Sequence, residues 1–215
     1  MLIVGAKGFA KEVLEVLYQL NDIENVVFYD DVSRDLPKQL FERFDILRNV
    51  EEVEKYFKNV DNRFTIGIGG PVLRKKMYDK FTTLGGAFTS TISPKANIGH
   101  YGTKISKGSN ILNGAIVSND VSIKIGTIVY FNTIITHDCL VGKFVELSPG
   151  AKLLGRVKIG DYSQIGASAT ILPNITIGEN VIVGAGSVVT QNVQDNCLVV
   201  GVPAKIIREL PSISF

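Results

Sequence analysis

The sequence predicts two domains: an α/β domain with a small, Rossmann-like parallel sheet, and an all-β domain that forms a parallel β-helix. Three observations favour this fold class. An aliphatic repeat of period six fills the second half of the chain, strands alternate with helices in the first half, and glycines recur in phase with the repeat. A length of 215 residues suits two such domains. We expect them at residues 1–92 and 93–215.

The repeat consists of fifteen consecutive positions, six residues apart, that all carry Ile, Val or Leu, from Ile105 to Val189. A helix of 3.6 residues per turn cannot keep a six-residue step on one face, and neither can an ordinary twisted strand. A chain that turns a corner every six residues can, and this is the hexapeptide pattern of a parallel β-helix. Because three hexads make one triangular coil, the repeat predicts five coils with the aliphatic side chains inside.

The corners of the predicted coils are also visible in the sequence. The residue two before each repeat position is small or β-branched, from Thr103 to Ser187, as expected where a side chain must fit beside a stacked copy of itself. Glycine follows the repeat position five times, where a turn favours a residue without Cβ. These glycines are Gly142, Gly160, Gly166, Gly178 and Gly184.

The first domain reads as strands alternating with helices, which is typical of a parallel sheet. A helix after the first strand carries Val13, Val16, Leu17 and Leu20 on one face. Pro71 suits the first turn of a later helix. The expected strands are Met1–Val4, Asn25–Tyr29, Arg63–Ile68 and a short one at Phe88–Ser90, and the later helices are Glu51–Lys58 and Pro71–Leu84.

Three features of this domain coincide at the carboxyl edge of the predicted sheet and together indicate a nucleotide site. A glycine loop, Gly5 to Gly8, opens a helix whose first amides attract phosphate. The pair Asp30-Asp31 ends the next strand, where a carboxylate can accept from a ribose or base. A third strand ends in a Gly-Ile-Gly-Gly segment that starts at Gly67 and lets a ligand approach the backbone. A tight turn without any ligand is the alternative, and a redox dinucleotide is disfavoured because only half of its usual domain is present.

Composition excludes several classes of protein. A net charge of +2 gives no field that would attract nucleic acid or an acidic membrane surface. Two cysteines give no disulfide framework, no apolar run is long enough to span a membrane, and no secretory signal is evident, so we expect a cytoplasmic protein. Only two histidines are present, fewer than the three that a zinc site of a hexapeptide-repeat hydratase would need, so we expect no metal.

One polar cluster in the β-helix can carry chemistry. His137 follows the repeat residue Ile135 by two positions, so its side chain should point outward at a coil edge, with Asp138 beside it and Cys139 turned inward. Imidazole is the usual general base for removing a proton from an alcohol or amine, and the carboxylate can orient it. Glu146 lies nine residues on, which places it on an adjoining edge. A surface histidine without function is the alternative.

The chain resembles the sugar O- and N-acyltransferases of the sialic acid O-acetyltransferase type, which include the bacterial UDP-4-amino-sugar N-acetyltransferases. The similarity extends over nearly the whole chain. Its motifs are Ile3–Gly8, Asp30-Asp31, the segment Ile66–Gly69 with Leu73–Lys76, His137–Gly142, Ser148–Ala151, Val183–Thr190 and Gly201–Lys205.

This resemblance implies a left-handed β-helix, a homotrimer and acetyl-CoA as co-substrate in the groove between neighbouring β-helices. It makes His137 the catalytic base and Asp138 its partner. The residues facing acetyl-CoA would be Gly155, Gly166, Ala167, Gly184, Ala185 and Lys205. The residues contacting a nucleotide-linked sugar would be Gly5, Ala6, Lys7, Gly8, Asp30, Asp31, Gly69 and Glu146, with Arg74 as a further candidate.

Two positions depart from the family pattern. Glu146 stands where many relatives have a second histidine that contacts the acceptor sugar, and Val202 replaces an asparagine near the coenzyme. The first leaves the acceptor sugar open. We expect acetyl transfer to an amino or hydroxyl group of a sugar by direct attack. A non-catalytic scaffold that binds a nucleotide or a partner is the alternative, whereas nucleotidyl transfer lacks both the length and the carboxylate pair for a metal.

Overall fold

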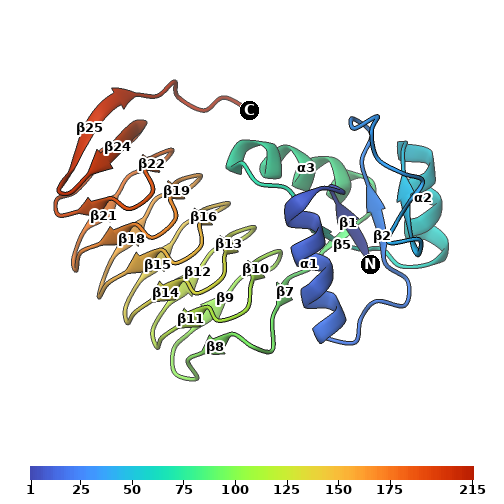
Figure 1. Cartoon of the computed structure of the whole chain (residues 1–215), viewed down its shortest axis with the longest axis horizontal. Coiled ribbons are helices and arrows are strands. Elements are labelled where there is room, and N and C mark those ends of the chain that lie inside the picture. Colours follow the sequence, from blue (N-terminus) through green and yellow to red (C-terminus); the bar gives the residue numbers. More distant parts are fainter.

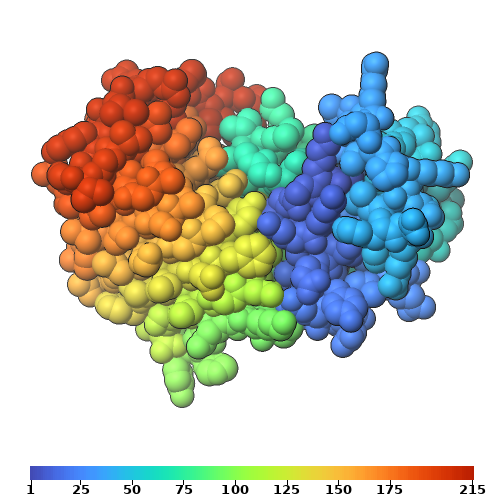
Figure 2. All heavy atoms as spheres, in the orientation of Figure 1, coloured from blue at the N-terminus to red at the C-terminus, as the bar shows by residue number.

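The computed structural model describes all residues from 1 to 215 and divides into a small α/β domain and a tall β-helix that lie side by side (Figure 1). Figure 2 shows the two parts in contact along one side of the β-helix. The first strand of the β-helix, β7, covers Thr91–Ile92 and so lies just before the domain boundary expected at 92/93. The division at that residue stays a prediction.

The α/β domain contains one six-stranded sheet in the order β3-β4-β2-β1-β5-β6, parallel except for the β3–β4 pair. Helix α1 packs on one face and helices α2 and α3 supply the apolar side chains on the other. The elements are β1 (Leu2–Val4), α1 (Gly8–Gln19), β2 (Val27–Tyr29), β3 (Gln39–Leu40), β4 (Phe44–Leu47), α2 (Val50–Asn59), β5 (Arg63–Ile66), α3 (Pro71–Thr83) and β6 (Ala87–Phe88). The three predicted helices and the first three predicted strands are therefore confirmed, with small shifts at their ends. The last strand, expected at Phe88–Ser90, lies at Ala87–Phe88, and the β3–β4 hairpin was not predicted.

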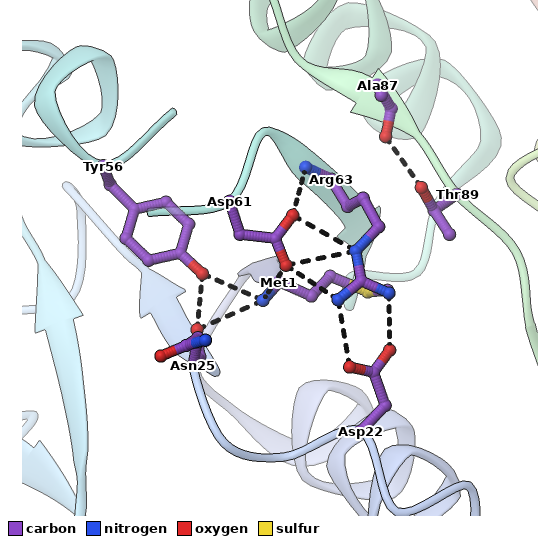
Figure 3. A network of polar contacts seen from close by, with 8 residues as sticks. All are labelled: Met1, Asp22, Asn25, Tyr56, Asp61, Arg63, Ala87 and Thr89. Atoms are coloured by element: carbon purple, nitrogen blue, oxygen red, sulfur yellow. Dashed lines mark hydrogen bonds and ion pairs between the residues drawn. The ribbon is translucent and has the colours of Figure 1, made fainter. Parts of the chain in front are cut away.

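A polar network fastens the loop after α1 to the start of β5 (Figure 3). The Arg63 guanidinium donates to both oxygens of Asp22, at 2.7 and 3.0 Å, and to Asp61 at 2.8 Å. The main-chain nitrogen of Met1 lies 2.9 Å from Asp61. Burial alone would raise the pKa of Asp61, but the hydrogen bonds from Arg63 and Met1 outweigh it and hold that pKa well below its usual value. The network fixes the starts of β1 and β5, at the end of the sheet opposite to the glycine loop.

The β-helix is a three-sided prism of two-residue strands. Sheet I contains β7, β10, β13, β16, β19, β22, β24 and β25; sheet II contains β8, β11, β14, β17, β20 and β23; sheet III contains β9, β12, β15, β18 and β21. Strands β7 to β23 are Thr91–Ile92, Asn97–Ile98, Lys104–Ile105, Asn110–Ile111, Ile116–Val117, Ser122–Ile123, Ile128–Val129, Ile134–Ile135, Leu140–Val141, Glu146–Leu147, Lys152–Leu153, Lys158–Ile159, Gln164–Ile165, Thr170–Ile171, Thr176–Ile177, Ile182–Val183 and Val188–Val189. A longer antiparallel pair, β24 (Cys197–Gly201) and β25 (Ala204–Glu209), closes the end.

The aliphatic repeat forms the core of this prism, as predicted. Each of the fifteen repeat residues is the second residue of a strand from β9 to β23, and pairs such as Ile123 and Val141 are 18 residues apart. Fourteen of the fifteen are no more than 2% exposed, and only Ile105 is partly exposed. Burying an Ile, Val or Leu contributes roughly 1.5–3 kcal/mol, so this column is the main source of stability in the domain.

The period of six breaks at both ends of the prism although the core continues. Ile92 and Ile98 occupy the first coil and pair 19 residues ahead, because one extra residue separates Ile98 from Ile105. At the other end, Val193 and Val199 pair with residues 16 positions earlier. The prism therefore begins before and ends after the span that a strict six-residue count predicts.

The α/β domain docks on sheet I of the prism. Thr65 Oγ1 lies 2.9 Å from Asn110 Oδ1, and Asn110 Nδ2 donates to the carbonyl of Ile66 at 2.9 Å. The ring of Phe9 at the start of α1 packs on Tyr130, with ring centroids 5.0 Å apart. Apolar and polar contacts thus both hold the glycine-loop end of the small sheet against sheet I.

Candidate active site

A pocket of about 440 Å³ opens at the carboxyl ends of β1, β2 and β5, where the sequence predicts a nucleotide site. Apolar side chains such as Phe9, Leu73 and Met77 line the rest of it. Seven residues predicted to contact a nucleotide-linked sugar line this pocket: Gly5, Ala6, Lys7, Gly8, Asp30, Asp31 and Gly69. The structure brings these residues together, and their role in binding stays a prediction.

Close backbone packing explains the first glycine of the loop. Gly5 has φ of +104°, and a Cβ there would lie 2.9 Å from the carbonyl oxygen of Gly67. Any other residue would therefore separate the ends of β1 and β5. Helix α1 begins at Gly8, and Lys7 before it gives no side-chain cap. The first amides of α1 are thus free to bind an anion in the pocket.

The two aspartates at the end of β2 are held in fixed orientations. Asp30 accepts from the backbone N–H groups of Val32 and Ser33, at 3.1 and 2.8 Å. Asp31 accepts from the Tyr29 hydroxyl at 2.7 Å and from Lys80 Nζ at 3.3 Å. Burial would raise the pKa of Asp31, but these two hydrogen bonds outweigh it and lower the pKa, so Asp31 is ionised at neutral pH.

Sequence reasoning did not single out the two partners of Asp31. Tyr29 directly precedes the aspartate pair, which is the one signal that could have identified it. Lys80 lies 49 residues beyond Asp31 on α3, and no local pattern connects the two.

Glu146 lies at the rim of this pocket and not beside His137, as the spacing predicted. It is the first residue of β16, in sheet I. Its Oε2 accepts from the backbone N–H of Gly70 at 3.2 Å and from Arg74 Nη1 at 3.1 Å. A Cβ on Gly69 would lie 3.5 Å from the same oxygen, so the carboxylate touches the wall of the pocket.

Arg74 does not contribute to the pocket lining, and the expectation that it contacts a nucleotide is wrong. It is 1% exposed and faces the β-helix instead. Its Nε donates to the carbonyl of Gly126, and its Nη2 donates to the carbonyls of Phe144 and Val145. Burial lowers the pKa of Arg74 to about 10, despite Glu146, so the guanidinium is still charged at neutral pH.

His137 and Asp138 lie in the turn between β14 and β15, at the edge where sheets II and III meet. His137 Nδ1 lies 2.6 Å from Asp138 Oδ2, and both side chains are about half exposed. When the ring is neutral, this contact places its proton on Nδ1 and leaves Nε2 free to accept one. Asp138 has φ of +59°, a conformation that aspartate tolerates better than most residues.

The next coil supports the imidazole from one side. Gly155 occupies the position 18 residues after His137, and a Cβ there would lie 2.7 Å from Cε1 and 2.8 Å from Nε2. Only glycine leaves room for the ring in its present position. Cys139 points inward, as predicted: it is 2% exposed, and burial raises the pKa of its thiol. A buried thiol of this kind is not a nucleophile.

Most of the residues expected to face acetyl-CoA lie at a different edge. Gly166, Ala167, Gly184 and Ala185 follow β19 and β22 at the edge between sheets I and II, stacked in successive coils. A Cβ on Gly166 would lie 2.6 Å from the backbone nitrogen of Ala185, so these turns stack without room for a side chain. Lys205 is exposed on β25, at the end of the prism.

One chain does not bring its three groups of predicted residues together. The pocket belongs to the domain docked on sheet I, and the His137 edge is the one that faces sheet I across the width of the prism. The Gly166 and Gly184 turns lie at a third position, beside sheet I. The three groups therefore occupy separate places on one chain.

The fold is that of a hexapeptide-repeat sugar acyltransferase of the sialic acid O-acetyltransferase type, and the chain belongs to this family. Its β-helix is accordingly left-handed. The PglD N-terminal domain family matches residues 1–81, and the bacterial transferase hexapeptide family matches residues 156–191.

Solved structures agree with this assignment over nearly the whole chain. The acetyltransferase domain of PglB from Neisseria gonorrhoeae is 30% identical, with a TM-score of 0.87 over 96% of this chain and 98% of that one. WeeI from Acinetobacter baumannii is 28% identical, with a TM-score of 0.86 over 96% and 98%. PerB from Caulobacter crescentus, solved with CoA and GDP-perosamine, is 28% identical, with a TM-score of 0.84 over 95% of each chain.

Two further features bear on cofactors and surroundings. No three His, Cys, Asp or Glu side chains lie together in an arrangement that could hold a metal ion. Among the helices, none combines the length and the apolar character needed to cross a membrane.

Proposed function

We propose that the protein transfers an acetyl group from acetyl-CoA to an amino group on a nucleotide-linked sugar, in the synthesis of a bacterial surface glycan. The PglB domain was also solved with acetyl-CoA, and PerB was solved with CoA and GDP-perosamine, an amino sugar nucleotide. The pocket of about 440 Å³, with a helix N-terminus and a fixed ionised Asp31, suits the diphosphate and the nucleoside of such a substrate.

In this proposal the reaction is a direct attack on the thioester. Nε2 of His137 takes a proton from the acceptor nitrogen as that nitrogen bonds to the acetyl carbon, and Asp138 holds the ring. The C–S bond then breaks and leaves CoA as the thiolate, which takes up a proton. A backbone N–H in the groove stabilises the oxyanion. No acyl-enzyme forms, because Cys139 is buried in the core.

The remaining predicted residues bind the two substrates. Backbone groups of the glycine and alanine turns line the groove for the pantetheine arm, and Lys205 contacts the phosphates of CoA. These residues are Gly155, Gly166, Ala167, Gly184 and Ala185. Glu146, at the rim of the nucleotide pocket, accepts a hydrogen bond from the amino or hydroxyl group of the sugar. Its negative charge favours an acceptor that carries an ammonium group over an anionic one.

The observation that carries the proposal is the position of His137 on the side of the prism away from the pocket of its own chain. A reaction that joins the pocket to His137 then needs more than one copy of the chain. A homotrimer of parallel prisms provides this, since the His137 edge of one copy faces the pocket side of the next.

Both cysteines are unpaired, which suits the cytoplasm.

The transfer is tested by incubating the protein with acetyl-CoA and a panel of UDP- and GDP-linked amino sugars, with matched hydroxyl sugars as controls. Free CoA and the acetylated product are measured by thiol titration and mass spectrometry. We expect release of CoA with at least one amino sugar and a loss of about 10²–10⁴-fold in kcat for His137→Ala, with its folding intact. No CoA release with any acceptor, or full activity in His137→Ala, contradicts the proposal.

A further inference from the structure

The wall of the nucleotide pocket that follows β5 has few anchors of its own. Gly67, Ile68 and Gly69 line the pocket there and Gly70 follows them, so three of these four residues lack a side chain. At its start, the N–H of Gly67 donates to the carbonyl of Val4 at 2.7 Å. Gly70, at its end, has φ of +78° and precedes the first residue of α3. Glycine-rich backbone of this kind is mobile unless outside contacts hold it.

The outside contact comes from the other domain. The N–H of Gly70 donates to Glu146 Oε2 at 3.2 Å, across 76 residues of sequence. The same carboxylate lies beside Gly69, which lines the pocket: a Cβ on Gly69 would be 3.5 Å from Oε2. Glu146 therefore fastens the distal half of the wall to the β-helix, and the shape of the nucleotide pocket depends on where this carboxylate is held.

Arg74 holds that carboxylate in place. Its Nη1 lies 3.1 Å from Glu146 Oε2, while its Nε and Nη2 donate to the carbonyls of Gly126, Phe144 and Val145. The backbone N–H of Arg74 donates to the carbonyl of Gly70 at 3.0 Å, but this is the first main-chain hydrogen bond of α3 and does not depend on the side chain. The guanidinium is buried and binds two adjacent turns of the prism at once. The planar fork of arginine suits this arrangement, and a lysine ammonium cannot reproduce it.

We propose that Arg74 is a positioning residue for the nucleotide-linked substrate: through Glu146 it sets the position of Gly70 and of the neighbouring Gly69, which lines the pocket, without touching the substrate itself. The inference rests on the proposed function, because it assigns the pocket to the nucleotide. The proposal also predicts different effects on the binding of the two substrates. Loosening Arg74 weakens the binding of the nucleotide, whereas the turns expected to bind acetyl-CoA lie at other edges of the prism and keep their arrangement.

The expected size of the effect follows from the population of the competent wall. If the wall adopts its binding arrangement about a tenth of the time after Arg74 is changed, the apparent Kd for the nucleotide rises about tenfold. The Kd of CoA is retained, because the turns expected to bind the coenzyme do not depend on Arg74. A purely structural role predicts a lower Tm with unchanged affinities in the folded protein.

The experiment compares Arg74→Lys and Arg74→Met with Lys76→Met, a control that removes an exposed cation from the same helix. Calorimetry measures the Kd of UDP, GDP and CoA for each folded protein, and steady-state kinetics measures KM for both substrates. We expect Kd for the nucleotide that the wild type binds, and KM for the nucleotide sugar, to rise about tenfold or more in both Arg74 variants. CoA affinity should change less than about threefold, and Lys76→Met should match the wild type throughout.

A further variant covers the case in which the arginine variants do not fold. Glu146→Ala removes the contact with Gly70 directly, and it changes a partly exposed side chain in place of the buried arginine. It should weaken UDP or GDP binding to a similar degree. Unchanged nucleotide affinity in folded Arg74→Lys or in Glu146→Ala overturns the inference, as does an equal loss of CoA affinity. A wild type that binds neither UDP nor GDP overturns the proposed function itself, so the two failures are distinguishable.

Discussion

The orientation of one imidazole depends on the residues that stack above and beside it. Asp138 fixes Nδ1 of His137 at 2.6 Å, and Gly155 in the next coil leaves room for the ring to pack against its backbone. Neither neighbour is a catalytic group by itself in the proposed reaction. Together they decide where Nε2 points, and catalysis by a general base requires that its nitrogen reach the acceptor proton within hydrogen-bond distance.

Gly155→Ala tests this dependence at the residue scale. The added Cβ would lie 2.7–2.8 Å from two ring atoms, so the imidazole must move. The φ of Gly155 is not in the left-handed region, so alanine brings no backbone strain. We expect kcat to fall about 100-fold, because a displacement of about 1 Å at a reacting group has that effect. The Tm should be retained.

Pro173→Ala is the matched control for this change, since Pro173 is exposed at the same edge one coil further on. It should retain activity. Steady-state kinetics with both substrates, together with a thermal melt, separates a displaced base from a weakened coenzyme site. Wild-type kcat in Gly155→Ala would show that the position of the ring does not matter.

At the scale of elements, the β-helix was predictable because every coil repeats one physical requirement. A six-residue step, an aliphatic side chain inside and a small residue at the corner recur without a break from Ile105 to Val189. The same requirement continues at Ile92, Ile98 and Val199, but inserted or missing residues change the spacing there. A search for a strict six-residue period misses these positions, whereas the pairing between strands continues through the change in spacing.

The repeat core makes a specific prediction about stability. In β18, Ile159 points into the core and is 2% exposed, while its neighbour Lys158 is exposed. We expect Ile159→Ala to lower the free energy of unfolding by about 2–5 kcal/mol, because it leaves a cavity in a packed column. Lys158→Ala should change it by less than about 0.5 kcal/mol. Denaturant unfolding at one fixed protein concentration measures both, and equal effects would contradict the assigned register.

Other elements could not be predicted because their causes lie far away in sequence. The β3 and β4 strands have only two and four residues, too few for a reliable alternating pattern. The contacts of Arg74 are with backbone carbonyl groups 52 to 71 residues away. Every residue has such a carbonyl, so the sequence does not indicate which ones the arginine will meet. The pocket residues were predictable, since the ends of neighbouring parallel strands meet at one edge whatever the details of the loops.

At the scale of the whole molecule, the pocket proposed to bind the nucleotide lies apart from the residue proposed as the catalytic base. The nucleotide pocket lies in the domain docked on sheet I, and His137 lies on the edge that faces sheet I across the prism. Joining the two within one chain would require undocking the domain from contacts that include the buried Arg74. We therefore expect each active site to combine the pocket of one copy with His137 of another, in a closed trimer.

Mixing two inactive variants tests this account most directly. His137→Ala keeps the pocket and lacks the base, whereas Gly8→Leu keeps the base and fills the pocket, since a Cβ on Gly8 meets no atom within 4 Å. Each should be nearly inactive alone. In trimers co-assembled at equal ratio, about one quarter of the sites join an intact pocket to an intact neighbouring base, so about one quarter of wild-type activity should return. No recovery above the separate variants would contradict a site shared between copies of the chain.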